Sequence, residues 1–310
     1  MRHVFLVNPA AGQQDQTARF TAMADSLHRR HSLNCTLLRT DGPGSAEAAA
    51  RRLAQTGEPL RLYVCGGDGT AHEAACGIAG FSNAAMTCIP AGTGNDLLRN
   101  FGADAVRFQD AENLWDGPAF PLDLIDCSGR LCLTIACNGI DARVADSGRR
   151  FSHLPLLRGR GSYLASVAAN FLFRGIGQHW HVSLDGAEEE GDFALVSMCN
   201  GRYYGGGSCP VPEARMDDGI LHTVLVKNIS RLKFARLFGP YSNGRYRALP
   251  PELIRVVTAR NVCIQSENDI VTCLDGESIH SRDVHLTLSD RKLNFFGPQG
   301  CDPNYGAGPR

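Results

Sequence analysis

The chain has 310 residues, of which 43 % are apolar and 20 % are charged, and its net charge at pH 7 is −1. This length favours two domains, and the composition is typical of an ordinary soluble globular protein. A net charge so close to zero excludes a globally basic nucleic-acid-binding protein, so we expect no nucleic-acid partner.

The first 125 residues alternate short apolar segments with amphipathic helical segments. Predicted strands lie at residues 4–7, 35–38, 62–65 and 86–89, and predicted helices lie around 20–27, 46–53, from 71 onward, and at 96–101. Strands that are apolar along their whole length and alternate with helices are typical of a parallel sheet covered on both faces. We therefore predict an α/β nucleotide-binding domain over residues 1–125.

The pattern changes after residue 125. Short β candidates lie at 131–137, 181–184, 193–199, 221–226, 256–257, 262–265, 270–274, 284–288 and 292–296, with helices at 162–173 and 231–238. Many short strands with turn residues between them are typical of an antiparallel sandwich. We predict a mostly antiparallel β-sandwich domain over residues 126–296. The Gly- and Pro-rich segment 297–310 is predicted to be a flexible tail.

Glycine-rich segments follow three of the predicted strands in the first domain. Residues 65–70 read Cys-Gly-Gly-Asp-Gly-Thr and residues 90–97 read Pro-Ala-Gly-Thr-Gly-Asn-Asp-Leu, while residues 8–12, Asn-Pro-Ala-Ala-Gly, are a weaker signal of the same kind. Glycines let a backbone approach a phosphate closely, and the helix that follows offers N–H donors. Because carboxyl ends of parallel strands share one edge of a sheet, we expect these segments to line one crevice.

Asp68, within the second glycine segment, has two interpretations. Its carboxylate could help hold Mg²⁺ or orient a hydroxyl group, or it could simply cap the helix that follows. The segments are neither a Walker A loop nor the Gly-x-Gly-x-x-Gly of dinucleotide-binding folds.

Taken together, the motifs resemble those of the diacylglycerol kinase-like family, which includes sphingosine kinases, ceramide kinases and bacterial lipid kinases. The more distant NAD kinases share the Gly-Gly-Asp-Gly-Thr element. Further matching blocks, in the family's order, are residues 138–144 (with Ile140 in place of the usual aromatic residue), 200–207, 212–221 and 274–277. The resemblance covers nearly the whole chain and implies an NAD kinase-like first domain and an ATP-dependent lipid kinase activity.

The resemblance also implies roles for individual residues. The implied ATP contacts are Asn8, Pro9, Gly12, Thr40, Gly66, Gly67, Asp68, Gly69, Thr70, Ala71, His72, Thr93, Gly94 and Asn95. Asp218, with the main-chain carbonyls of Arg215 and Ile220, is expected to hold a structural Mg²⁺. Glu277 is expected to be the general base for the acceptor hydroxyl. Separately from the resemblance, phosphoryl transfer needs a carboxylate that positions the catalytic Mg²⁺, and Asp68 is the candidate.

Alternatives stay open beside these roles. Residues 217–219 and 275–277 are Asp-Gly-containing segments that also suit plain hairpin turns. A soluble-substrate kinase acting on NAD shares the glycine loop, and a catalytically silent nucleotide- or lipid-binding regulator is a third possibility. The expected reaction is transfer of the γ-phosphoryl group of ATP to a hydroxyl of a lipid such as diacylglycerol, a step of phospholipid biosynthesis. No motif marks which lipid is the acceptor.

The remaining expectations concern the location and contacts of the chain. The cysteines show no metal or redox spacing, no secretory segment follows Met1, and no apolar run reaches about 18 residues, so we expect a cytoplasmic chain with free thiols. Arginines beside leucines within 149–160, ahead of the helix at 162–173, could seat the protein transiently on anionic headgroups. Alternatively, the helix packs against the β domain and the arginines are solvated. Bacterial relatives suggest a monomer or homodimer.

Overall fold

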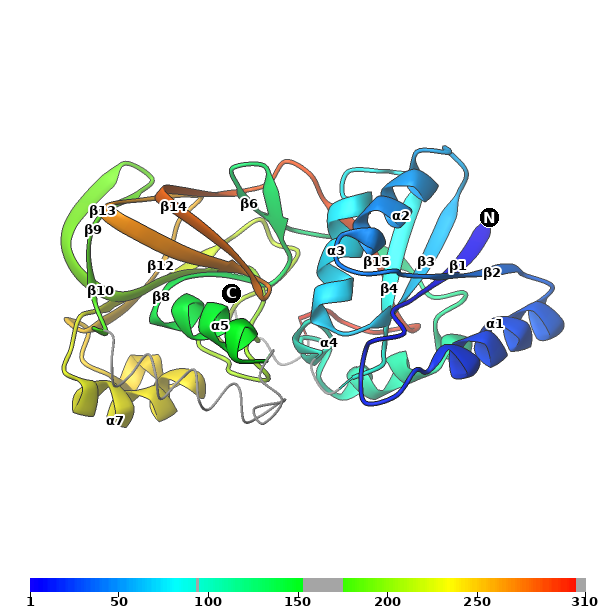
Figure 1. Cartoon of the computed structure of the whole chain (residues 1–310), viewed down its shortest axis with the longest axis horizontal. Coiled ribbons are helices and arrows are strands. Elements are labelled where there is room, and N and C mark those ends of the chain that lie inside the picture. The colour runs from blue at the N-terminus through cyan, green and yellow to red at the C-terminus, as the bar shows by residue number, and fades with distance from the viewer. Residues whose placement is uncertain (93–94, 153–174, 305–310) are drawn as a thin grey trace.

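The computed structural model describes residues 1–92, 95–152 and 175–304, with only the backbone of 148–152, and shows two domains side by side (Figure 1). The first domain contains a six-stranded sheet of order β2-β1-β3-β4-β15-β5. Its strands are β1 (Arg2–Val7), β2 (Asn34–Arg39), β3 (Leu60–Gly66), β4 (Ala84–Pro90), β5 (Ala119–Leu122) and β15 (Leu293–Phe296). All neighbours are parallel except β5, which runs antiparallel to β15.

Helices bury apolar faces against this sheet, as the periodicity predicted. They are α1 (Thr17–His31), α2 (Ser45–Ala54), α3 (Asp68–Ile78) and α4 (Asp96–Arg99), followed by the 3₁₀ turns η1 (Gly102–Gln109) and η2 (Ala111–Asn113). Phe20, Ala24 and Leu27 are the buried residues of α1. Because the residues of β1 from Val4 to Val7 are fully buried, the sheet has no solvated face there. The α/β prediction for this domain is confirmed.

The second domain is built from one nine-stranded antiparallel sheet that folds over itself. Its strands are β6 (Ile125–Cys127), β7 (Arg130–Cys132), β8 (Ile135–Gly139), β9 (Gln178–Leu184), β10 (Ala187–Cys199), β11 (His222–Lys227), β12 (Ile254–Thr258), β13 (Asn261–Leu274) and β14 (Glu277–Leu288). The long strands β10 and β13 each pair with β9 along one half and with β8 along the other. Register irregularities in both strands lie between these halves and allow the bend. The mostly antiparallel β prediction is confirmed.

In the described part of the second domain, two helices and one short 3₁₀ turn accompany the sheet. They are α5 (Ile140–Ser152), α7 (Arg231–Ser242) and η3 (Tyr246–Ala248). Both helices lie on the same side of the sheet in Figure 1. The helix predicted at 162–173 lies outside the described residues.

The structure differs from the sequence predictions at three places. The strand predicted at 131–137 is interrupted at Leu133 and Thr134, which lie between β7 and β8. The strand predicted at 292–296 in the second domain is β15, which belongs to the first sheet. The segment predicted as a flexible tail contains a buried side chain, Asn304, whose Oδ1 accepts a hydrogen bond from the Met216 N–H at 3.0 Å.

The chain therefore crosses between the domains twice, once from β5 to β6 and once from β14 back to β15. The two crossings are bonded to each other: the backbone N–H of Ser289, between β14 and β15, donates to the carbonyl of Leu124, between β5 and β6, at 2.9 Å. Among the described helices, none has the length and apolar character needed to cross a membrane.

Candidate active site

A cavity of about 1110 Å³ lies at the carboxyl ends of β1, β3 and β4. The predicted ATP contacts that line it are Asn8, Gly12, Thr40, Gly67, Asp68, Gly69 and Thr70. Asn8 Nδ2 donates to Thr70 Oγ1 at 2.9 Å, which links the first glycine segment to the second. The N-terminus of α3 opens into this space and offers N–H donors and a positive dipole to an anion.

Other predicted ATP contacts lie elsewhere. Ala71 and His72 line a second cavity, and Asn95 lines a separate hollow beside Arg19 and Arg99. Pro9 and Gly66 are not among the described residues that line these cavities. Gly66 has a local role instead, because a Cβ there would lie 2.6 Å from Thr70 Cβ. Thr93 and Gly94 lie outside the described residues.

Gly12 allows two of the glycine segments to touch. It adopts φ +82°, and a Cβ at this position would lie 2.3 Å from the carbonyl oxygen of Ala91. A side chain would thus be strained in its backbone and would collide with the main chain of the neighbouring segment.

We expect Gly12→Ala to weaken ATP binding by about tenfold or more, because the first segment must move away from Ala91. Isothermal titration with ATP measures the change. Gly57→Ala is the matched control, since Gly57 also has a positive φ of +75° but nothing lies within 4 Å of its added Cβ. Equal ATP affinity in both variants would show that this contact does not shape the site.

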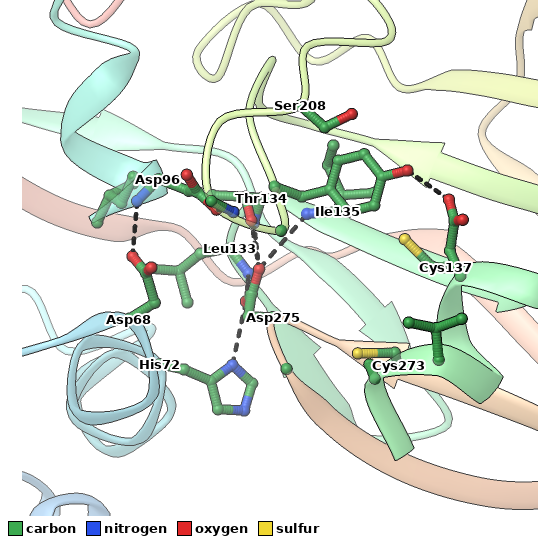
Figure 2. A pocket seen from close by; sticks show the side chains of 18 of the residues that line it. Asp68, His72, Asp96, Leu133, Thr134, Ile135, Cys137, Ser208, Cys273 and Asp275 are labelled. Carbon is green, nitrogen blue, oxygen red and sulfur yellow. Dashed lines mark hydrogen bonds and ion pairs between the residues drawn. The ribbon is translucent and has the colours of Figure 1, made fainter. Parts of the chain in front are cut away.

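The second cavity, of about 770 Å³, lies between the two domains (Figure 2). Its polar end carries Asp68, His72, Asp96, Thr134 and Asp275. Its remaining wall is largely apolar and includes Leu97, Leu133, Ile135, Ile140, Val144, Ala145, Phe234, Ala235 and Phe238. A mostly apolar hollow with a few polar groups suits an amphiphilic ligand.

Asp68 lines both cavities. Its Oδ1 accepts the backbone N–H of Asp96 at 2.9 Å, so a side chain at the start of α3 is tied to the start of α4. Burial, together with the charges of Asp96 and Asp275, raises the pKa of Asp68 to about 6. A carboxylate crowded by other carboxylates favours a nearby cation, so this position fits a Mg²⁺ that accompanies ATP.

Asp96 and Asp275 were not among the predicted site residues. Asp96 Oδ2 accepts the N–H of Gly206 from the second domain at 2.7 Å, and burial raises the pKa of Asp96. The sequence signals were present, since Asp96 ends the glycine segment 90–96 and Asp275 precedes Glu277. Their side chains point toward the same space in Figure 2.

Asp275 is held by contacts from both domains. Its Oδ1 accepts the Thr134 N–H at 2.9 Å and the Thr134 hydroxyl at 2.5 Å, and its Oδ2 accepts the Leu133 N–H at 2.5 Å. The interruption between β7 and β8 therefore frees two N–H groups for this carboxylate. From the first domain, His72 Nδ1 lies 3.1 Å from Asp275 Oδ2.

His72 and Asp275 form a buried ion pair between the domains. Burial alone would raise the pKa of Asp275, but the hydrogen bonds from His72, Thr134 and Leu133 hold it at about 2. Burial alone would lower the pKa of His72, but its hydrogen bonds to Asp275 and Cys76 raise it to about 11. With all its oxygens engaged, Asp275 is a poor proton acceptor and a strong interdomain contact.

Another buried carboxylate, Asp141, lines the same interdomain cavity. Asp141 of α5 accepts a hydrogen bond from the Tyr204 hydroxyl, which lies 3.2 Å from the Tyr241 hydroxyl. Burial raises the pKa of Asp141. The resemblance to residues 138–144 pointed to this region but assigned Asp141 no role.

Glu277, the predicted general base, begins β14 and is exposed. It is not among the described residues that line the cavity, whereas Asp275 and Gly276 of the same turn are. The structure therefore places Glu277 at the edge of the site, and its role stays a prediction.

The predicted Mg²⁺ loop, residues 215–220, does not line the cavity formed by the glycine segments. Asp218 Oδ1 accepts the N–H of Ile220 in its own loop at 3.0 Å. Nearby, the buried carboxylate of Asp123 accepts the Gly219 N–H at 2.7 Å and pairs with Lys292. In the described part of the chain no group of three or more His, Cys, Asp or Glu side chains is arranged to hold a metal. The Mg²⁺ site predicted at Asp218, Arg215 and Ile220 stays a prediction, and the buried carboxylate beside it, Asp123, already has the Lys292 ammonium group as a cation.

Comparisons with known proteins match both domains. The family model of the diacylglycerol kinase catalytic domain matches residues 2–127, and that of the YegS C-terminal NAD kinase beta sandwich-like domain matches residues 134–296. A Pseudomonas aeruginosa protein named "Probable lipid kinase YegS-like" is 34 % identical over 246 residues, 77 % of each chain. A Mycobacterium tuberculosis protein named "Diacylglycerol kinase" is 33 % identical over 213 residues, 66 % of each chain.

Solved structures show the same fold. A diacylglycerol kinase from Bacillus anthracis str. Sterne superposes with a TM-score of 0.69 at 22 % identity, covering 96 % of each chain. A further crystal structure from the same strain gives a TM-score of 0.74 at 24 % identity, also over 96 % of each chain. At such identities the likeness concerns the fold alone.

Proposed function

This chain belongs to the diacylglycerol kinase family of lipid kinases, and we propose that it transfers the γ-phosphoryl group of ATP to a hydroxyl group of a lipid. The observation that carries the proposal is the position of Asp68, which lines both the glycine-rich cavity and the apolar cavity. A phosphoryl group held in the first cavity would meet a hydroxyl held in the second beside this carboxylate.

The proposed reaction exchanges one phosphorus–oxygen bond for another. The bond from the γ-phosphorus to the oxygen shared with the β-phosphate breaks, and a bond to the acceptor oxygen forms. The hydroxyl proton passes to a carboxylate, and ADP and a phosphorylated lipid leave. The chain contributes mainly orientation, because the glycine segments and the N-terminus of α3 can hold the phosphates with N–H donors.

Asp68 would hold the Mg²⁺ that accompanies ATP. When bound, that ion neutralises negative charge on the phosphates. The chain's own residues set the position of the carboxylate, through the hydrogen bond from the Asp96 N–H to Asp68 Oδ1.

The apolar wall of the interdomain cavity favours a lipid over a soluble acceptor such as NAD. Phe234 and Phe238 of α7 line this wall, and Leu232 of the same helix is 63 % exposed beside Lys233 and Arg236.

We propose that the enzyme meets a membrane surface transiently and acts as a monomer or homodimer. Co-sedimentation with anionic vesicles tests the contact, and a protein that stays in the supernatant would exclude it. The arginines of 149–160, predicted for this role, have no described side chains.

The function is tested by following labelled γ-phosphate from Mg-ATP to a panel of micellar hydroxylated lipids and to NAD. Label in one or more lipids supports the proposal. Label in NAD alone would move the chain to the soluble-substrate kinases. ATP binding without transfer to any acceptor would favour a silent regulator.

In the same assay Glu277→Gln is expected to lower turnover by about 10²-fold or more, the usual loss when a general base is removed. The exposed position of Glu277 predicts that the variant folds normally, which circular dichroism and ATP binding can confirm. Near-normal turnover in the folded variant would exclude Glu277 as the base and leave Asp68 as the carboxylate beside the acceptor.

A further inference from the structure

Three chain segments converge at the junction between the domains. They are the crossing that contains Asp123 and Leu124, the return crossing from Ser289 to Lys292, and the loop 215–220. Asp123 is at the centre and is only 1 % exposed. Its N–H donates to the Met216 carbonyl at 2.6 Å, and its Oδ2 accepts the Gly219 N–H at 2.7 Å. Asp123 thus contacts the loop twice, at Met216 through its main chain and at Gly219 through its carboxylate.

Lys292 supplies the positive charge for this carboxylate. Its Nζ pairs with Asp123 Oδ1, while the side chain remains 45 % exposed as it reaches in from the surface. It is one of three lysines in a chain that otherwise carries arginine. A buried carboxylate without a counter-charge is strongly unfavourable, so the ammonium group stabilises the junction.

The same ammonium group takes up one oxygen of the buried carboxylate beside the loop 215–220. Both oxygens of Asp123 are engaged, one by Lys292 and one by the Gly219 N–H. The other acidic side chains of the loop have partners of their own, since Asp218 accepts the Ile220 N–H and Asp217 accepts Asn304 Nδ2 at 2.7 Å. A Mg²⁺ at this carboxylate would have to displace a hydrogen-bond donor or sit against a like charge.

We propose that the ε-ammonium group of Lys292 is the resident cation of the domain junction, in place of a divalent metal ion. The loop 215–220 then keeps its conformation without Mg²⁺, and the only Mg²⁺ that the protein needs is the one that accompanies ATP. This inference concerns the folded protein and does not rest on the identity of the acceptor.

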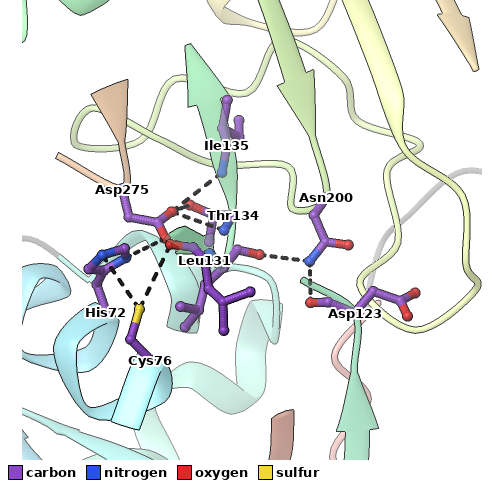
Figure 3. A network of polar contacts seen from close by, with 9 residues as sticks. His72, Cys76, Asp123, Leu131, Thr134, Ile135, Asn200 and Asp275 are labelled. Carbon is purple, nitrogen blue, oxygen red and sulfur yellow. Dashed lines mark hydrogen bonds and ion pairs between the residues drawn. The ribbon is translucent and has the colours of Figure 1, made fainter. Parts of the chain in front are cut away.

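The domain junction is connected to the interdomain cavity through Asn200 (Figure 3). Asn200 Nδ2 donates to the Asp123 carbonyl and to the Leu133 carbonyl, each at 2.7 Å. The Leu133 N–H in turn donates to Asp275. The charge at Lys292 therefore supports the backbone that positions Asp275.

The test is thermal unfolding of the nucleotide-free protein in EDTA and in millimolar MgCl₂. It is done in the wild type and in Asp68→Asn, so that any ion bound at Asp68 is separated from one bound at the junction. We expect the Tm of Asp68→Asn to be the same in both buffers. A Tm that falls by several degrees in EDTA in both proteins would overturn the proposal.

Lys292→Met keeps the length of the side chain and removes its charge. Its Tm is expected to fall by roughly 5 °C or more in EDTA and to recover in part with Mg²⁺, because the vacated carboxylate can then bind the ion. Lys233→Met, on the exposed face of α7, is the control and should leave the Tm unchanged. A Lys292→Met variant as stable as the wild type would overturn the proposal. If that variant does not fold, the buffer comparison in Asp68→Asn decides alone.

Discussion

Asp68→Asn is expected to lower kcat/KM for phosphoryl transfer by at least about 10²-fold while the protein stays folded. The substitution keeps the size of the side chain and the hydrogen bond that its oxygen accepts from the Asp96 N–H. It removes the negative charge at the one place where the two cavities share a carboxylate. Burial and neighbouring charges also make this change favourable for stability, since the charged form is disfavoured.

The pH dependence of the wild type gives a second readout for Asp68. Because its pKa is raised to about 6, kcat/KM should increase as the pH rises through that value, when the carboxylate becomes ionised. The variant should lack this step. Asp25→Asn, on the exposed face of α1, is the control. An Asp68→Asn enzyme within about threefold of the wild type would contradict the role given to this residue.

Asp275→Asn is expected to destabilise the protein by about 3–5 kcal/mol, the range for breaking a buried ion pair by removal of one partner. The side chains of His72 and Asp275 are only 11 % and 6 % exposed. An amide in place of the carboxylate would direct N–H donors at groups that are themselves donors, namely Thr134, Leu133 or His72. The interdomain ion pair would be lost and the buried imidazolium left without a carboxylate to balance its charge.

The sign of the pH effect follows from the two pKa shifts. The pKa of Asp275 falls from 3.8 to about 2, so its contribution is present above 3.8 and is lost as the pH falls toward 2. The pKa of His72 rises from 6.5 to about 11, so its contribution is complete below 6.5 and is lost as the pH rises toward 11. The difference in unfolding free energy between wild type and variant should therefore be greatest between about pH 4 and pH 6.5.

Urea unfolding measures this difference, and Glu277→Gln is its matched control. Both substitutions convert an acid to its amide within one turn, but Glu277 is exposed whereas Asp275 is buried. We expect the Glu277 variant to unfold as the wild type does, and the Asp275 variant to unfold at much lower urea. Equal stability of the two variants would contradict the interdomain role of Asp275.

The helices, strands and glycine segments that were predicted correctly are those whose signal lies within one short stretch of sequence. The glycines of 66–69 directly follow a buried strand, so their place at the end of β3 and the start of α3 could be predicted. The same holds for the apolar face of α1 and for the apolar parts of β10 and β13, although both are longer strands than the sequence predicted. Local backbone requirements and periodicity are sufficient for such features.

The features that the sequence analysis missed join residues far apart in the chain. His72 and Asp275 are 203 positions apart, and Lys292 and Asp123 are 169 apart. Nothing local in 131–137 indicates that a strand should break to offer N–H groups to Asp275. Likewise, β15 looks like one more strand of the second domain until its pairing with β4 and β5 is seen. Such pairings depend on tertiary packing, which a single sequence does not reveal.

The most direct test of the account is the amount of ADP formed by the wild-type enzyme with and without micellar lipid. If Asp68 stands between an ATP site and a lipid site, ADP formation should require the lipid and should equal, mole for mole, the phosphorylated lipid produced. ADP formed at the same rate without lipid, or ATP bound tightly with no ADP formed in the presence of any lipid, would contradict it.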